Sequence, residues 1–137
     1  MNAAPIGGSS SQRHEMATLL VVEDDVLIRH SVCEALRHAT YKVLEASSAR
    51  EALTILDTLP VDLLFVDLHM PGESDGVSVA RYARRHFPEI PVLLTSGKLR
   101  ASAVPDLDDL GPFIPKPYLI SRLLDRIRDT LENSDPG

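Results

Sequence analysis

The sequence predicts an α/β domain built on a parallel sheet, and two observations support this fold class. Five short apolar runs alternate with stretches whose apolar residues recur at helical spacing. Two of the runs, residues 19–22 and 63–66, are apolar without a break, which is typical of central strands covered on both faces. At 137 residues, the chain has the length of one domain with one core.

The predicted strands cover residues 18–22, 41–46, 62–66, 91–95 and 112–114. A first, core-facing helix is predicted from apolar residues at helical spacing, namely Ile28, Val32, Ala35, Leu36 and Ala39. A second helix begins with the capping-box pattern Ser48-Ala49-Arg50-Glu51 and ends before Pro60. In such a box the two polar side chains satisfy free amides at the start of the helix.

A third helix is predicted after Asp75, and a last one over residues 121–131. The third should bury Val77, Val79, Ala80 and Ala83, and the last should bury Leu123, Leu124, Ile127 and Leu131. The third also carries a basic group, Arg81, Arg84, Arg85 and His86. We interpret this group as a solvated face, with partner docking as the alternative. Another helix is due within residues 98–110, but Pro105 interrupts the pattern there and predicts a short turn or a loop.

Composition excludes several classes of function. The chain has 20 acidic and 14 basic residues, so no global basic field points to direct binding of nucleic acid or of an anionic membrane. The single cysteine, Cys33, cannot form an internal disulfide, and we expect it to be a buried, inert thiol of the first helix. Residues 1–16 and 134–137 are expected to be disordered. The sequence shows neither a secretory signal nor a membrane span, which favours a cytoplasmic location.

Polar residues follow four of the predicted strands. Glu23-Asp24-Asp25 closes the first strand, Asp67 closes the third, Thr95 ends the fourth and Lys116 follows the fifth. In a parallel sheet these residues meet at the carboxyl edge, where ligands of open α/β folds bind. Converging carboxylates repel unless a cation lies between them. An acid pair, an acceptor Asp, a hydroxyl and a lysine together favour a phosphoryl-transfer site.

The chain resembles the receiver domain of bacterial two-component response regulators, and we place this domain at residues 17–133. The resemblance rests on four motifs in order: Val21-Val22-Glu23-Asp24-Asp25, Asp67-Leu68-His69-Met70-Pro71 followed by Gly76, Thr95-Ser96-Gly97, and Lys116-Pro117. It implies a flavodoxin-like, doubly wound sheet of five parallel strands in the order 2-1-3-4-5. It also implies that the Lys116-Pro117 bond is cis.

The resemblance implies a role for each residue at the predicted edge. Asp67 would be the phosphoacceptor. The cofactor would be Mg²⁺, bound by Asp24 and Asp67 directly, by Glu23 through water, and by the backbone carbonyl of His69. Asp25 matches no ligand position and is expected in the first helical turn, where the helix dipole favours an acid.

The resemblance also implies the remaining roles. Thr95 would hydrogen-bond the phosphoryl oxygens, Lys116 would offset their charge, and Thr95 and Phe113 would form the switch. Each residue also has a simpler interpretation: Asp67 and Thr95 as caps or turn formers, Lys116 as a solvated lysine, and Phe113 as a core residue.

The function favoured by the resemblance is a signalling switch that accepts a phosphoryl group from a sensor histidine kinase or a histidine phosphotransfer protein. It would act by binding an unknown downstream protein, without turnover catalysis, and its oligomeric state is left open. One alternative is a receiver excised from a hybrid histidine kinase. A Mg²⁺-dependent aspartyl-phosphate phosphatase needs a second Asp where this chain has His69. A passive pseudo-receiver predicts a broken acid pocket.

Overall fold

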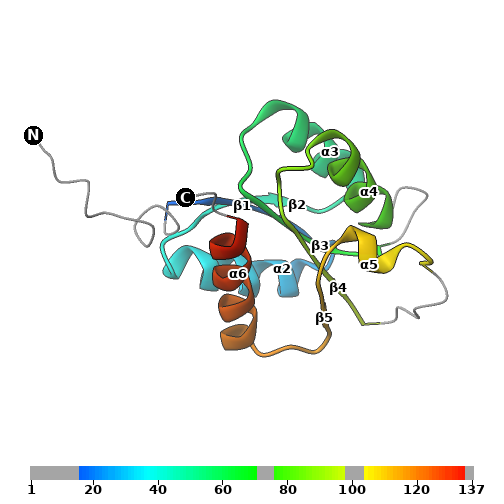
Figure 1. Ribbon diagram of the computed structural model, residues 1–137. Helices are drawn as coiled ribbons and strands as arrows, with labels where there is room; N and C mark the ends of the chain where they lie inside the picture. The colour runs from blue at the N-terminus through cyan, green and yellow to red at the C-terminus, as the bar shows by residue number, and fades with distance from the viewer. Residues whose placement is uncertain (1–15, 71–75, 98–103, 135–137) are drawn as a thin grey trace, which may run out of the picture.

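The computed structural model describes residues 16–70, 76–97 and 104–134. Five parallel strands form one sheet in the order β2-β1-β3-β4-β5 (Figure 1). They are β1 (Thr18–Val22), β2 (Lys42–Ala46), β3 (Leu63–Asp67), β4 (Val92–Ser96) and β5 (Phe113–Pro115). The predicted strand order is confirmed, and each predicted strand end is correct to within one residue. The terminal segments expected to be disordered lie outside the described residues, except for Met16 and Ser134.

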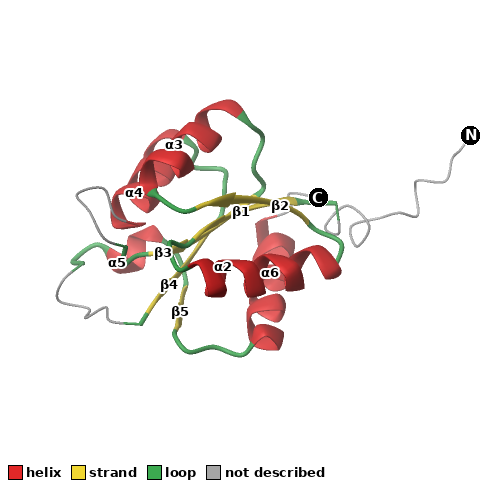
Figure 2. Ribbon diagram, turned by 180° about the vertical axis from the view of Figure 1, so that it is seen from behind, coloured by secondary structure: helices red, strands yellow, loops and turns green. Residues whose placement is uncertain are grey.

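Helices cover both faces of the sheet (Figures 1 and 2). One face carries α2 (Val26–His38) and α6 (Ile120–Ser134), and the other carries α3 (Ala49–Thr58), α4 (Gly76–His86) and α5 (Leu107–Leu110). Because alternate residues of a strand point to opposite faces, Leu20 and Leu64 pack toward α3 and α4, whereas Leu19 and Leu63 pack toward α2 and α6. This two-sided burial explains the unbroken apolar runs of β1 and β3.

The first helix, α2, begins directly after the acidic group of β1. Asp25 is its N-cap, and the Asp25 carboxylate accepts a hydrogen bond of 3.0 Å from the Ile28 backbone N–H. Asp25 was expected inside the first turn; it precedes the turn because its side chain satisfies an amide that the helix leaves free. Cys33 is fully buried, as predicted, and burial raises the pKa of the Cys33 thiol to about 11.

The start of α3 confirms half of the predicted capping box. The Ser48 hydroxyl accepts a hydrogen bond of 3.2 Å from the Glu51 N–H. The Glu51 carboxylate, however, reaches one residue further back than the box requires and accepts a bond of 2.7 Å from the Ser47 N–H. The helix ends at Thr58, close to the end indicated by Pro60.

The third and last predicted helices are present as α4 and α6. Most of their predicted core residues are buried, but Val77 and Leu124 are only half-buried. The predicted N-cap Asp75 lies outside the described residues. Arg84, Arg85 and His86 are exposed in the last turn of α4, where cations interact favourably with the helix dipole. Within the described part of the chain, no helix is long and apolar enough to cross a bilayer.

The predicted irregular segment contains one short helix. Pro105 lies in the turn before α5, which has four residues, and residues 98–103 lie outside the described part. Asp106 accepts two hydrogen bonds from the Arg81 guanidinium, at 2.6 and 3.0 Å, and this pair attaches the start of α5 to α4. Gly111 follows α5 with φ +151°, and a side chain there would overlap the Val92 carbonyl oxygen.

The Ser48 cap predicts a measurable contribution to stability. In Ser48→Ala the Glu51 amide loses its acceptor, so the free energy of unfolding should fall by about 1 kcal/mol in urea titrations. Thr54→Ala is the matched control. It removes an exposed hydroxyl bond to the Arg50 carbonyl on the same helix but gains helix propensity, so it should cause no loss. Equal losses in both variants would contradict the capping role.

Candidate functional site

The candidate site forms because the polar residues directly follow or end adjacent strands. Asp67 of β3 is the register partner of Thr95 of β4. The Lys116 backbone N–H donates to the Ser96 carbonyl at 3.1 Å, and the Glu23 N–H donates to the Ala46 carbonyl at 3.0 Å, so each strand pairing extends into the site. The sheet thereby brings Glu23, Asp67, Thr95 and Lys116 to one edge, as predicted.

Three carboxylates cluster at this edge. One carboxylate oxygen from each of Glu23, Asp24 and Asp67 lies within 4.8 Å of the other two. Glu23 and Asp67 are 4% and 3% exposed, whereas Asp24 is more accessible to solvent. Like charges this close disfavour ionisation, so the cluster needs positive charge nearby.

Lys116 supplies that charge from the opposite side of the site. Its ammonium donates to Glu23 Oε1 at 2.8 Å and to Asp67 Oδ2 at 2.7 Å. Burial opposes the charged ammonium, but the bonds to Asp67 and Glu23 outweigh this effect and raise the pKa of Lys116. Burial also raises the pKa of Glu23, and the bond from Lys116 offsets only part of this rise. Lys116 therefore stays charged and ties β1, β3 and β5 together.

Both oxygens of the Asp67 carboxylate are held by donors. Oδ2 accepts from Lys116, and Oδ1 accepts a bond of 2.9 Å from the His69 backbone N–H. The His69 side chain is exposed. Behind Asp67, Gly76 lies so close that a side chain at this position would overlap the Asp67 carbonyl oxygen. These two bonds therefore fix the orientation of the carboxylate.

The two predicted switch residues lie on the adjacent strands β4 and β5. The Thr95 hydroxyl is buried and has no hydrogen-bond partner among the described residues, so it can still donate to a ligand oxygen. Phe113 is the register partner of Leu94 in β4 and packs, half-buried, with the apolar cluster beneath α3, α4 and α5. The Lys116-Pro117 peptide bond is cis, as the resemblance implied.

The donor set fits Mg²⁺. Carboxylate and backbone oxygens are the ligands this ion takes, and one or two carboxylates usually suffice because it retains several waters. The clustered oxygens of Glu23, Asp24 and Asp67 provide such ligands. The arrangement can thus hold a divalent cation beside a nucleophilic carboxylate, with an ammonium and a hydroxyl for the oxygens of a transferred phosphoryl group.

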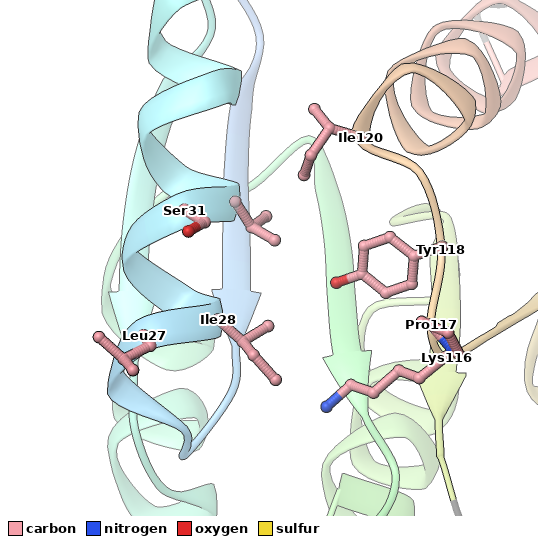
Figure 3. A pocket seen from close by; sticks show the side chains of 8 residues that line it. Leu27, Ile28, Ser31, Lys116, Pro117, Tyr118 and Ile120 are labelled. Atoms are coloured by element: carbon pink, nitrogen blue, oxygen red, sulfur yellow. The ribbon is translucent and has the colours of Figure 1, made fainter.

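A cavity of about 340 Å³ adjoins the site between α2 and the segment that follows β5 (Figure 3). Its walls are mostly apolar, with Leu27 and Ile28 on one side and Pro117 and Ile120 on the other. Figure 3 shows the Lys116 ammonium and the Tyr118 hydroxyl pointing from the β5 side toward α2. Burial raises the pKa of Tyr118 to about 12, so its hydroxyl stays protonated. Lys116 lines the cavity and binds Glu23 and Asp67, so the cavity and the acid cluster share this side chain.

Sequence reasoning missed two residues beside the site, Tyr118 and Arg29. Tyr118 packs its ring edge-on against Phe65 and follows the Lys116-Pro117 motif directly, which was the available signal. The Arg29 guanidinium donates to the Glu23 carbonyl at 2.8 Å. Its position four residues after Asp25 is one helical turn along α2, but that signal is readable only once the start of the helix is known.

Comparisons with known proteins agree with this geometry. A family model for the response regulator receiver domain matches residues 19–128. The sensor kinase CckA of Brucella abortus is 35% identical over 123 residues, which cover 87% of this chain and 13% of that protein. The response regulator MprA of Mycolicibacterium vanbaalenii is 33% identical over 120 residues, which cover 86% of this chain and 52% of that protein. The chain therefore spans about half the length of MprA and a much smaller part of CckA.

A solved structure supports the fold. The CheY-like response regulator receiver domain protein of Methanospirillum hungatei JF-1 matches with a TM-score of 0.81 at 24% identity. The match covers 87% of this chain and 96% of that one.

The position of Lys116 predicts a stability defect that depends on pH. Lys116→Met leaves two buried carboxylates without a counter-charge, so the free energy of unfolding at neutral pH should fall by about 3 kcal/mol. In the variant, burial raises the folded-state pKa of Glu23 without the offsetting bond from Lys116, so the destabilisation appears as the pH rises through that pKa and vanishes in mild acid, where the carboxyl is protonated. Urea titrations at neutral and mildly acidic pH measure the difference.

Lys42→Met is the matched control, because Lys42 is exposed on β2 and its removal changes the net charge equally. This control should leave stability nearly unchanged at both pH values. A Lys116→Met defect of the same size at both pH values would contradict a role in charge compensation.

Proposed function

Because the chain belongs to the response regulator receiver domains, we propose that it is a phosphorylation-controlled switch that accepts a phosphoryl group on Asp67. The observation that carries this proposal is the fixed Asp67 carboxylate, which lies beside two further acids and receives hydrogen bonds from Lys116 and from the His69 N–H. A side chain used only as a turn former needs neither the burial nor the ammonium.

The proposed reaction is a displacement at phosphorus. A carboxylate oxygen of Asp67 attacks the phosphoryl group of a partner's phosphohistidine, the new O–P bond forms, and the P–N bond breaks with its electron pair returning to the imidazole. Lys116 donates to the phosphoryl oxygens and offsets their charge. The Thr95 hydroxyl, which has no other partner among the described residues, donates to another of these oxygens. The product is an acyl phosphate on Asp67.

The residues present also suit the family's metal. Asp24, Asp67 and the His69 backbone carbonyl would hold Mg²⁺ directly, and Glu23 would hold it through water. When bound, the ion supplies positive charge against the phosphoryl oxygens. Asp24, the more exposed of the three acids, remains open to a hydrated ion.

The proposed readout is a movement of Thr95 and Phe113. Phosphorylation adds about 1.5 to 2 negative charges and strong acceptor oxygens at Asp67, which draw the Thr95 hydroxyl toward them. The half-buried ring of Phe113 can then shift within the cluster beneath α4 and α5. The site would thus alter the surface that a downstream protein binds, and the chain would support its own phosphotransfer and autodephosphorylation without turning over a substrate.

The partner proposed as phosphodonor is a sensor histidine kinase or a histidine phosphotransfer protein. To bring an imidazole to Asp67, such a protein must contact the rim of the site. Leu27 lines the apolar cavity of Figure 3 and is 79% exposed. Its neighbour in sequence Val26 is 64% exposed, and Leu119, which lies in sequence between the lining residues Tyr118 and Ile120, is 69% exposed. Exposed apolar side chains on the segments that enclose an apolar cavity favour a protein partner.

A receiver from a hybrid histidine kinase is the second candidate, and the similarity to a sensor kinase favours it to the same degree as the similarity to MprA favours a response regulator. Its chemistry at Asp67 would be identical. The phosphatase alternative has no support at residue 69, because the side chain there is an exposed histidine.

Phosphorylation of Asp67 is the primary test. Incubation with Mg²⁺ and a small phosphodonor should add one acid-labile, hydroxylamine-sensitive phosphate, visible in the intact mass. Asp67→Asn should abolish the addition, because the amide cannot act as the nucleophile. Asp25→Asn, which changes the charge equally but keeps a good N-cap, should be phosphorylated like the wild type. Undiminished phosphorylation of Asp67→Asn would refute the proposal.

The metal role of Asp24 is tested by titration with Mg²⁺ followed by NMR. Asp24→Asn should weaken binding by more than about tenfold, the lower end of the loss that even outer-shell changes cause. Asp25→Asn removes the same charge one residue further on and should bind with nearly wild-type affinity. Similar affinities for both variants would mean that Asp24 is not a ligand and that only the summed charge matters.

A further inference from the structure

Arg29 connects three elements beside the acid cluster. From the first turn of α2, its Nη1 donates to the backbone carbonyl of Glu23 at 2.8 Å. Its Nε donates to the Glu45 carboxylate of β2 at 3.1 Å. The Arg29 side chain is 18% exposed. One guanidinium thus joins the peptide that follows β1 to the end of β2, which suits the rigid fork of donors that arginine presents.

The peptide held by Arg29 carries the Asp24 backbone. Among the described residues no hydrogen bond or ion pair fixes the Asp24 carboxylate, so its position is set by the backbone. On one side Arg29 fixes the carbonyl oxygen of the Glu23-Asp24 peptide. On the other side the Asp25 N–H donates to Glu23 Oε2 at 3.1 Å, while the Asp25 carboxylate caps α2. The Arg29 bond is the only one of these that depends on a side chain outside the acidic group.

We propose that Arg29 is a positioning residue, which orients the Glu23-Asp24 peptide so that the Asp24 carboxylate is aimed at a divalent cation bound beside Asp67. This inference rests on the proposed function of the acid cluster. Arg29 acts through the backbone and touches neither the cation nor the phosphoryl group. Its hydrogen bond orients Asp24 in the way that hydrogen bonds to metal ligands fix the orientation of those ligands.

The structure offers a matched control in Arg37. Its guanidinium binds the same Glu45 carboxylate at 3.0 Å, two turns further along α2. Its other bond goes to the Val43 carbonyl at 3.1 Å, away from the acidic group. Arg29 and Arg37 therefore share their charge, their helix and their acidic partner. They differ in which carbonyl they hold and in exposure, which is 18% for Arg29 and 46% for Arg37.

If Arg29 acted only through its charge, its removal would change the affinity for Mg²⁺ in the direction opposite to that expected if it positions Asp24. Removing a cation near three carboxylates makes the local potential more negative, which strengthens the binding of Mg²⁺. Removing the bond that orients the Glu23-Asp24 peptide weakens it. The direction of the change in affinity for Arg29→Gln therefore decides between the two effects.

The experiment compares Mg²⁺ affinity, by NMR titration, in the wild type, Arg29→Gln, Arg29→Lys and Arg37→Gln. Arg29→Gln should weaken binding about tenfold, as outer-shell changes commonly do. Arg29→Lys keeps the charge but cannot hold Glu23 and Glu45 with one planar group, so it should recover part of the loss. Arg37→Gln should bind as tightly as the wild type, or slightly more tightly. Urea midpoints should be similar for the two glutamine variants, which separates positioning from general destabilisation.

One further readout and two contrary outcomes make the experiment decisive. In the absence of Mg²⁺, the Asp24 amide resonance should shift in Arg29→Gln and stay in place in Arg37→Gln. Affinity in Arg29→Gln equal to or tighter than in the wild type would overturn the positioning role and leave the proposed function intact. Failure of the wild type itself to bind Mg²⁺ would overturn the proposed function, and the positioning role with it.

Discussion

The rest of the site depends on the ion pairs that the Lys116 ammonium makes with Glu23 and Asp67. Glu23 and Asp67 are buried within a few ångströms of each other, and two such charges are unfavourable in a protein interior unless a cation satisfies both. Lys116 reaches both with bonds of 2.8 and 2.7 Å. The same contact joins the outermost strand β5 to β1 and β3 near the middle of the sheet. Charge compensation and the arrangement of the strand ends are therefore one feature of the molecule.

Much of this arrangement follows from the sequence, for physical reasons that particular residues illustrate. The runs at Leu19 and Leu63 could be assigned to central strands because only two-sided burial accounts for four apolar residues in succession. Once those strands are parallel and adjacent, Asp67 and the acidic group after β1 must share an edge. The prediction that Lys116 lies with them followed from its place after the last strand.

The details that escaped prediction depend on side-chain reach within the fold. Glu51 accepts from Ser47 rather than closing the box with Ser48, a difference of one residue that periodicity does not contain. Asp25 was assigned to the first turn because of its acidic character, but α2 begins at Val26, so Asp25 is the N-cap. Arg29 looked like any exposed basic residue of an amphipathic helix. Its contact with the Glu23 carbonyl exists only because β1 turns into α2 within three residues.

The separation in sequence between the partners of Lys116 has a consequence for the order of assembly. Lys116 and Glu23 are 93 residues apart, and Lys116 and Asp67 are 49 apart. Such distant contacts form only after the entropy of closing long loops has been overcome. During synthesis, β1 and β3 emerge well before β5, so until β5 is made their acids have no Lys116 to compensate their charge. When β5 joins the sheet, Lys116 offsets the repulsion between these carboxylates. The acid cluster is therefore complete only when the whole sheet has formed. A nascent or truncated chain that lacks β5 has the Asp67 carboxylate but not the ammonium that compensates its charge.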